Sequence, residues 1–169
     1  MDFIANTAPT HTVRTLLDAG WPTDYHYRLY VGVLRGDPVL VKEALDHGAD
    51  PNKPIRGGRL VDSAIGRATS LSYDGMDAEP RASALAALEL LLKAGAKLDE
   101  GTPRSGGGDI VRVYAYSGQQ ENIRPVLDLL VRYATPTARK NSLYWLRIGG
   151  PTTAQRQANL DWLIGRLEQ

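Results

Sequence analysis

The segment that decides the fold is LYVGVLRGDPVLVKEALDHGADPN, residues 29–52. Apolar residues recur three and four positions apart on both sides of Gly36-Asp37-Pro38, which is the spacing of helices that bury one face. Glycine permits a sharp bend and proline suits the first turn of a helix, so these three residues predict a tight turn between two helices. Gly48 follows the second apolar run, where a left-handed glycine commonly closes a helix. The segment therefore predicts a helix, a turn, a second helix and a polar loop.

The second-helix phrase of this segment recurs along the chain in degenerate form. Each copy is a run of aliphatic residues that ends in a small residue plus glycine, followed by a polar turn. We expect Gly20, Gly48 and Gly95 to supply the left-handed residue that ends each helix, whereas the fourth copy has Ala134 in that place. The copies are VRTLLDAG (13–20), VKEALDHGAD (41–50), LELLLKAGAK (88–97) and VLDLLVRYA (126–134). Such a recurrence indicates a helical repeat protein.

The spacing in residues 29–52 resembles the ankyrin repeat, and the string HGADPN is similar to the AGADVN ending of that family. The residues at the expected offsets are Leu29, Gly32, Val33, Gly36, Val41, Leu45, Gly48, Ala49, Asp50 and Asn52. The family's Thr-Pro-Leu-His tetrapeptide, whose hydrogen bonds tie one turn to the next, is absent, and YRLY (27–30) and RLVD (59–62) stand in its place. The resemblance implies an all-α solenoid of helix-turn-helix-loop units.

The resemblance divides residues 1–169 into repeats of one domain. We expect a partial repeat over residues 3–24, full repeats over 25–54, 55–101 and 102–137, and a closing helical pair over 138–169. The repeat over 55–101 carries an insertion, residues 69–83, that adds no periodic apolar face and is expected on the surface. The closing pair is expected to be atypical because its outer face meets water. It is recognisable by Leu160, Leu163, Ile164 and Leu167 at helical spacing.

The composition excludes several classes of protein. The 169 residues contain no cysteine, which excludes a disulfide framework, a thiolate zinc site and a cysteine nucleophile. A formal net charge of +1 gives no strong field to hold a polyanion, so nucleic acid is not the expected partner. The longest apolar run, residues 84–88, stops at Glu89, and no basic residue precedes Arg14. We expect a soluble, cytoplasmic protein with no membrane span.

The sequence offers no catalytic or metal-binding pattern. None of the three histidines is spaced as a metal ligand, and the acidic residues are scattered where exposed helix faces are expected. The glycine-rich residues 104–109 lack the Gly-Lys-Ser or Gly-Lys-Thr of a phosphate loop, so we expect a loop between helices there. We expect no enzyme, no cofactor and no metal. An enzyme that uses residues 69–83 as a lid is the alternative, but it lacks a catalytic constellation.

We expect the histidines and aromatic residues to occupy different positions in the fold, some structural and some at a surface. His47 precedes Gly48 and is expected to have a structural role at a helix end. His26 lies among tyrosines, which leaves open whether it belongs to an interface or to incidental surface. Tyr30 and Tyr114 are expected to replace missing consensus packing residues. Trp145 and Trp162 are expected in the core of the closing helices.

The remaining candidates are of residue types that dominate interface hot spots, namely Trp, Tyr and Arg. The chain has 15 Arg against 5 Lys, and Arg is favoured in planar contacts at interfaces. The resemblance implies that loop tips and the shorter first helices form a concave recognition face. Applied residue by residue, it selects Tyr25, His26, Arg35, Arg56, Arg59, Arg67, Arg112 and Tyr116.

These residues predict a module that recognises another protein and acts by occlusion or scaffolding. Small ankyrin proteins include immunity proteins that neutralise a cognate toxin and adaptors that regulate an enzyme, and the resemblance therefore implies either role. We favour the immunity protein. Nucleic-acid binding through the arginine-rich loops is a further alternative, which a steep loss of affinity with rising salt would reveal.

Overall fold

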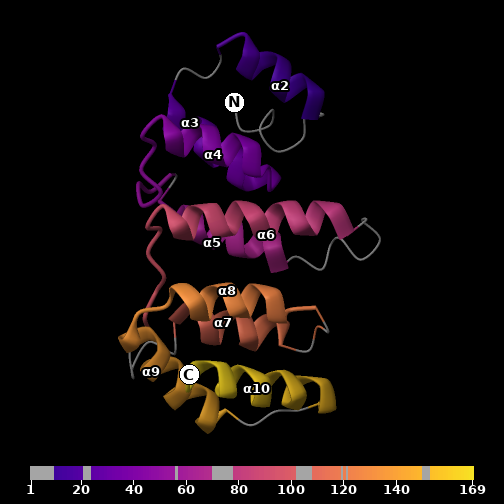
Figure 1. The fold of residues 1–169 in the computed structure, drawn as a ribbon, viewed down its shortest axis with the longest axis vertical. Coiled ribbons are helices and arrows are strands. Elements are labelled where there is room, and N and C mark those ends of the chain that lie inside the picture. The colour runs from indigo at the N-terminus through magenta and orange to yellow at the C-terminus, as the bar shows by residue number, and fades with distance from the viewer. Residues whose placement is uncertain are drawn as a thin grey trace. The chain divides into compact units, whose positions relative to one another are not determined.

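A computed structural model describes residues 10–20, 24–55, 57–69, 78–101, 108–118, 120, 122–149 and 153–169. Within these ranges every regular element is an α-helix, apart from one isolated antiparallel bridge between Ile55 and Gly58, so the all-α prediction is confirmed there. The chain divides into two compact units, Met1–Lys97 and Leu98–Gln169. The described helices are α2 (Thr10–Asp18), α3 (Tyr25–Arg35), α4 (Pro38–Asp46), α5 (Leu60–Thr69), α6 (Ala78–Lys93), α7 (Gly108–Ser117), α8 (Arg124–Tyr133), α9 (Pro136–Ile148) and α10 (Ala154–Leu167) (Figure 1).

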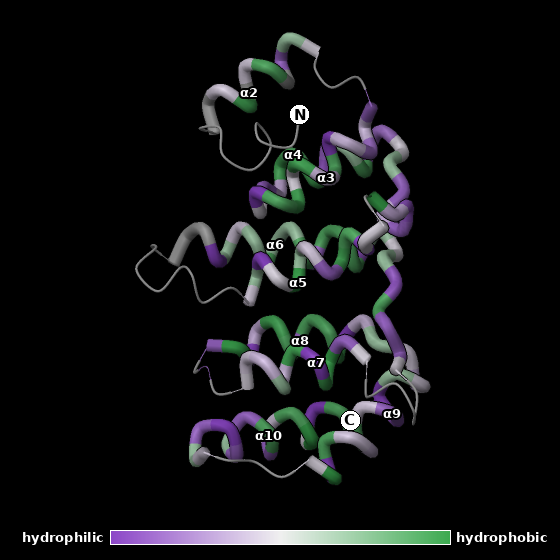
Figure 2. Tube along the Cα trace, turned by 180° about the vertical axis from the view of Figure 1, so that it is seen from behind, coloured by the Kyte–Doolittle hydropathy of each residue, from purple (hydrophilic) through white to green (hydrophobic). Residues whose placement is uncertain are grey.

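The N-terminal unit contains two helix pairs. The first helices of the two pairs contact each other, and so do the second helices. Helix α3 contacts α4, and α5 contacts α6, while α3 also contacts α5 and α4 contacts α6. Val13 of α2 is buried against Val31 and Leu40, with Tyr27 packed on the same cluster. Apolar and polar stretches alternate along the labelled helices in Figure 2, as expected for helices that bury one face. None of the described helices is both long and apolar enough to span a membrane.

The turn between α3 and α4 has the predicted geometry. Gly36 has a left-handed φ of 65°, and its N–H and that of Asp37 donate to carbonyls of the last turn of α3. The Asp37 carboxylate accepts the N–H groups of the second and third residues of α4, and Pro38 occupies the first helical position. A Cβ on Gly32 would lie 3.0 Å from the Leu40 Cβ, so this glycine lets α3 and α4 approach closely.

The predicted left-handed glycines at helix ends are confirmed. Gly20, Gly48 and Gly95 have φ values of 85°, 82° and 90°. Helix α8 ends differently, because Ala134 is extended and Thr135 directly caps the first turn of α9 with its hydroxyl. Helix α9 therefore starts at Pro136, two residues before the expected start of the closing helical pair.

Both described ends of the predicted insertion, residues 69–83, are helical. Thr69 is the last residue of α5, and α6 already begins at Ala78. Alanine-rich sequence has high helix propensity and Pro80 is tolerated in a first turn, which explains why α6 extends backwards. Residues 70–77 lie outside the described ranges.

Asparagine and histidine side chains join successive loops and helices of the N-terminal unit. The Asn52 amide donates to the Gly95 carbonyl at 2.9 Å, and its oxygen accepts the Lys97 N–H at 2.8 Å. The loop after α4 is thereby bound to the loop after α6. His47, the residue after α4, places Nδ1 2.9 Å from the Glu43 carbonyl, which confirms its structural role at a helix end.

In the C-terminal unit α7 contacts α8 and α9, and α10 contacts α8 and α9. The core includes Ile123, Leu127, Leu130 and Leu163, all nearly inaccessible to solvent. Asn159 of α10 is fully buried, and its amide donates to the carbonyls of Gly118 at 2.8 Å and Gln120 at 3.0 Å. The Asn159 oxygen accepts the Arg124 Nε–H at 2.9 Å. A polar side chain thus fixes the turn between α7 and α8 onto α10.

Aromatic residues add to the packing of α10. Tyr114 is buried as predicted, and its hydroxyl donates to the Arg156 carbonyl at 3.1 Å while the Arg156 guanidinium lies 5.2 Å from the ring centroid. Trp162 is half-buried beneath the Arg124 guanidinium, and Trp145 is half-buried beside Tyr144. The two tryptophans therefore lie at the margin of the core rather than inside it. Tyr30 is likewise half-buried and contacts Tyr27 through their rings.

Candidate binding surface

Tyr25 lies at the start of α3 in a stack of three side chains. Its ring is parallel to that of His47 with centroids 4.2 Å apart, and the Arg28 guanidinium lies 5.1 Å from its centroid. Arg28 is held in turn by the Glu43 carboxylate at 2.9 Å. The stack on His47 joins the start of α3 to the end of α4. Because Tyr25 is half-buried, it offers only part of its ring to a partner.

His26 is a structural link rather than incidental surface. Its Nε2 accepts the N–H of Asp50 in the loop after α4 at 3.0 Å, which requires the ring proton on Nδ1. Nδ1 lies 3.4 Å from the carboxylate of Asp24, the residue that caps α3. The His26 backbone N–H donates to that carboxylate and holds the pKa of Asp24 below its usual value. The contact with Asp50 could not be found from spacing, because it joins residues of two separate segments.

Arg35 and Arg67 are brought together by the packing of α3 on α5. A terminal nitrogen of Arg67 lies 3.5 Å from the carbonyl oxygen of Arg35, and both side chains are half-buried. Burial lowers the pKa of Arg67, and the nearby positive charge of Arg35 lowers it further. Two residues selected from successive predicted repeats therefore meet on neighbouring first helices.

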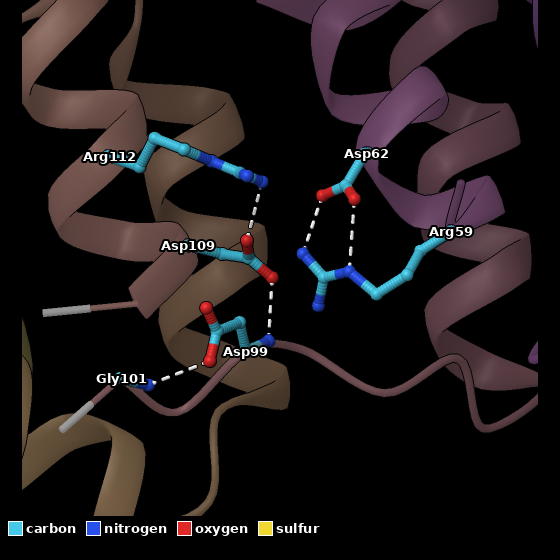
Figure 3. A network of polar contacts seen from close by, with 6 residues as sticks. All are labelled: Arg59, Asp62, Asp99, Gly101, Asp109 and Arg112. Carbon is cyan, nitrogen blue, oxygen red and sulfur yellow. Dashed lines mark hydrogen bonds and ion pairs between the residues drawn. The ribbon is translucent and has the colours of Figure 1, made fainter. Parts of the chain in front are cut away.

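Arg59 and Arg112 are each engaged by an acidic residue three positions away. The Arg59 guanidinium donates to both oxygens of Asp62, at 3.0 and 2.5 Å (Figure 3). Arg112 donates to Asp109 at 2.6 Å. Tyr116 follows Arg112 by one turn of α7 and is 80% exposed. Arg56 lies outside the described residues.

The expectation that acidic residues lie on exposed faces is wrong for Asp109. This residue belongs to the first turn of α7, not to a loop, and it is fully buried. Its carboxylate accepts the Asp99 N–H at 2.7 Å and the Arg112 guanidinium (Figure 3). The Asp99 carboxylate accepts the Gly101 N–H at 3.0 Å. The buried carboxylate fastens residues 99–101 to α7, which is a structural use of a group that elsewhere suggests acid–base chemistry.

Gly108 makes this arrangement possible. It has a left-handed φ of 71°, and a Cβ at this position would lie 2.1 Å from the Asp99 carbonyl oxygen. The same carbonyl accepts the Asp109 N–H at 3.1 Å, so the backbone segments touch at Gly108. Glycine at the first position of α7 is therefore explained by packing against residues 99–101.

Sequence reasoning missed an exposed face of α9. Lys140, Tyr144 and Ile148 recur at four-residue intervals, and the two apolar side chains are 55% and 60% exposed. The buried residues of α9 are Ala138, Ser142 and Leu146, which lie two residues away from that series. We call Lys140, Tyr144 and Ile148 the α9 face. The sequence signal was the helix PTARKNSLYWLRI, which contains three basic residues and no acidic one.

Two of the open grooves on the described surface lie along α9 and α4. One, about 510 Å³ in volume, runs beside the N-terminal half of α9, and we call it the α9 groove. It is lined by Ala134, Pro136, Arg139, Lys140, Leu143, Leu167 and Gln169. The other, about 570 Å³, runs along α4 and is lined by Pro38, Val39, Lys42, Glu43, Asp46, His47 and Leu90. Both grooves are shallow and open to solvent.

Comparisons with protein-family models, curated proteins and solved structures find no match to this chain. Among the residues that the structure describes, no group of three or more His, Asp or Glu side chains is placed to hold a metal ion. The geometry therefore has to be interpreted from the residues themselves.

Proposed function

We propose that this protein is an ankyrin-type helical-repeat module that recognises another protein. The observation that carries the proposal is the meeting of Arg35 and Arg67 on neighbouring first helices, at the positions that the repeat pattern selects for partner contact. Half-buried arginines hold their guanidinium groups in place and are enriched among residues that dominate binding energy.

The packing supports the repeat interpretation. In the N-terminal unit α3 lies against α5 and α4 against α6, and in the C-terminal unit α7 lies against α9 and α8 against α10. Asn52, the last residue of the string HGADPN, binds the loop of the next helix pair. His26 supplies a second link between turns through Asp50. These contacts perform the linking that the missing Thr-Pro-Leu-His tetrapeptide performs in the ankyrin family.

We further propose that the module neutralises its partner by covering the partner's active surface, as an immunity protein covers a toxin. An adaptor that brings an enzyme to another molecule would use the same contacts. The partner's own activity separates the two roles, because occlusion abolishes that activity at equimolar protein and scaffolding leaves it intact. A nucleic-acid partner would instead show affinity that falls steeply between low and physiological salt.

The test is a pair of charge-matched double variants of the full chain, assayed by calorimetry against the protein captured from native lysate. Arg35→Gln with Arg67→Gln removes two charges from first helices, whereas Lys42→Gln with Lys93→Gln removes two from second helices. The lysines form exposed ion pairs with Asp46 and Glu89. We expect the arginine variant to weaken binding by about tenfold or more and the lysine variant to leave it within about threefold. Equal effects of the two variants would place the contact elsewhere.

A further inference from the structure

The α9 face and α9 groove combine positive charge with exposed apolar surface. Arg139 and Lys140 are the fourth and fifth residues of α9, and in the part of the chain that the structure describes their side chains form no ion pair or hydrogen bond. Arg147, the other basic residue of α9, is paired with Glu168 at 2.5 Å. Arg139 and Lys140 are thus cations available to a partner.

These two cations are not placed for the stability of α9. They lie near the N-terminal end of the helix, where the helix dipole favours acidic side chains and disfavours basic ones. The Glu100 carboxylate accepts a hydrogen bond from the hydroxyl of Thr135, the residue that caps α9. A negatively charged ligand at this end of α9 would therefore interact favourably both with these two side chains and with the helix dipole.

The apolar side chains on this surface narrow the class of ligand further than the two charges do. Pro136, Leu143 and Leu167 line the α9 groove together with the two cations, and α9 also exposes Tyr144 and Ile148. A polyanion such as nucleic acid gains little from exposed isoleucine and leucine, and a charged lipid surface would need a larger cluster of cations. Acidic residues interspersed with apolar ones match both features of the surface.

We propose that the α9 face and α9 groove bind an acidic, amphipathic segment of a protein partner. Carboxylates of that segment contact Arg139 and Lys140, and its apolar side chains occupy the groove and cover Tyr144 and Ile148. This site differs from the Arg35 and Arg67 contact, and the inference depends on the proposed function only in naming a protein as the occupant.

The probe is a fluorescein-labelled synthetic peptide in which Leu and Phe recur at helical spacing among Glu and Asp. Its binding to the full-length protein is followed by fluorescence anisotropy at physiological salt. One control peptide replaces Glu and Asp by Gln and Asn, and another replaces Leu and Phe by Ser. We expect the acidic amphipathic peptide to bind and each control peptide to bind at least about tenfold more weakly.

Matched protein variants locate the site. Arg139→Glu with Lys140→Glu should weaken the peptide by about tenfold or more, whereas Lys53→Glu with Lys97→Glu, which changes the net charge equally on exposed lysines, should change affinity by less than about threefold. Tyr144→Ser with Ile148→Ser should also weaken binding by about fivefold or more. Circular dichroism confirms that each variant is folded, and glutamates near the start of α9 favour the helix.

Three outcomes would overturn the proposal. Equal weakening by the two charge-reversal pairs would indicate unspecific attraction, and binding of the Ser-containing peptide as tightly as the Leu and Phe peptide would remove the apolar requirement. Displacement of the peptide by an equimolar single-stranded oligonucleotide would assign the surface to nucleic acid. The peptide assay uses no captured partner, so its result is independent of the Arg35 and Arg67 test.

Discussion

At the scale of single residues, glycines in different backbone conformations have opposite expected effects when replaced. Gly48 has a φ of 82°, and a Cβ there would meet no atom within 4 Å, so its substitution causes conformational strain without a clash. Gly66 lies inside α5 without a positive φ, and a Cβ there also meets open space. Because a Cβ causes no clash at either position, a difference in stability between the two variants reports on backbone conformation.

We predict that Gly48→Ala lowers the free energy of unfolding by about 1 kcal/mol, because alanine disfavours the left-handed region. Gly66→Ala should raise it by about 0.5–1 kcal/mol, because alanine loses less backbone entropy in a helix. Urea titrations followed by circular dichroism measure both. A stabilised Gly48→Ala variant would mean that the helix does not end in a left-handed residue.

Asn159 gives a second prediction at this scale. Asn159→Ala removes the buried amide that serves the Gly118 and Gln120 carbonyls and the acceptor of Arg124, so buried polar groups lose their partners. We expect a loss of about 2–3 kcal/mol in the free energy of unfolding. Gln157→Ala, which breaks only a hydrogen bond to Asp161 within the same helix, is the control and should cost less than about 1 kcal/mol. Similar losses in the two variants would contradict this role of Asn159.

At the scale of helices, Asp128 connects α8 to α10. Its carboxylate accepts Arg166 of α10 through two guanidinium nitrogens and Arg132 of its own helix at 2.7 Å. Burial by itself raises the pKa of Asp128, but the hydrogen bonds from Arg166 and Arg132 outweigh it and hold the pKa below its usual value. The folded protein therefore favours the ionised carboxylate.

A lowered pKa in the folded state makes this link dependent on pH. The ionised Asp128 carboxylate contributes fully to the free energy of unfolding above its unfolded-state pKa of about 4. This contribution is lost as the pH falls through the lower, folded-state pKa. We predict that Asp128→Asn destabilises the protein by about 1–2 kcal/mol at pH 7 and that the difference from the native protein disappears in strong acid. Denaturant titrations across the acid range test this. A difference that stays constant down to low pH would show that charge on Asp128 is not what stabilises the contact.

At the scale of the whole molecule, the C-terminal unit has a core of its own. Ile123, Leu127, Leu130 and Leu163 are buried among α7 to α10, and Asn159 and Asp128 link the same helices. We predict that residues 98–169 alone retain a helical circular dichroism spectrum and unfold cooperatively. Their urea dependence should be about half that of the full chain, because the slope follows the surface exposed on unfolding. A spectrum without helix would show that this unit needs residues 1–97 to fold.

Local signals in the sequence were sufficient for the turn after α3 and for the glycines that end α2, α4 and α6. The Gly36-Asp37-Pro38 turn and the left-handed Gly48 depend on residues within a few positions of each other, so pattern and propensity predict them. The Asp109 carboxylate is buried because a backbone N–H ten residues earlier satisfies it, and no local pattern reveals that partner. The α9 face was missed for a similar reason. Leu146 and Ile148 are both apolar, and only the packing of α7 and α10 decides which one is covered.

Three of the loop connections depend on the same chemical group, a primary amide. Asn52, Asn141 and Asn159 each donate side-chain N–H groups to backbone carbonyls of another segment. Hydrolysis of such an amide leaves a carboxylate, which is an acceptor only and would face carbonyl oxygens. Asn52 is exposed, so hydrolysis of its amide would loosen the loop after α4 from the loop after α6, whereas Asn159 is shielded from water by its burial.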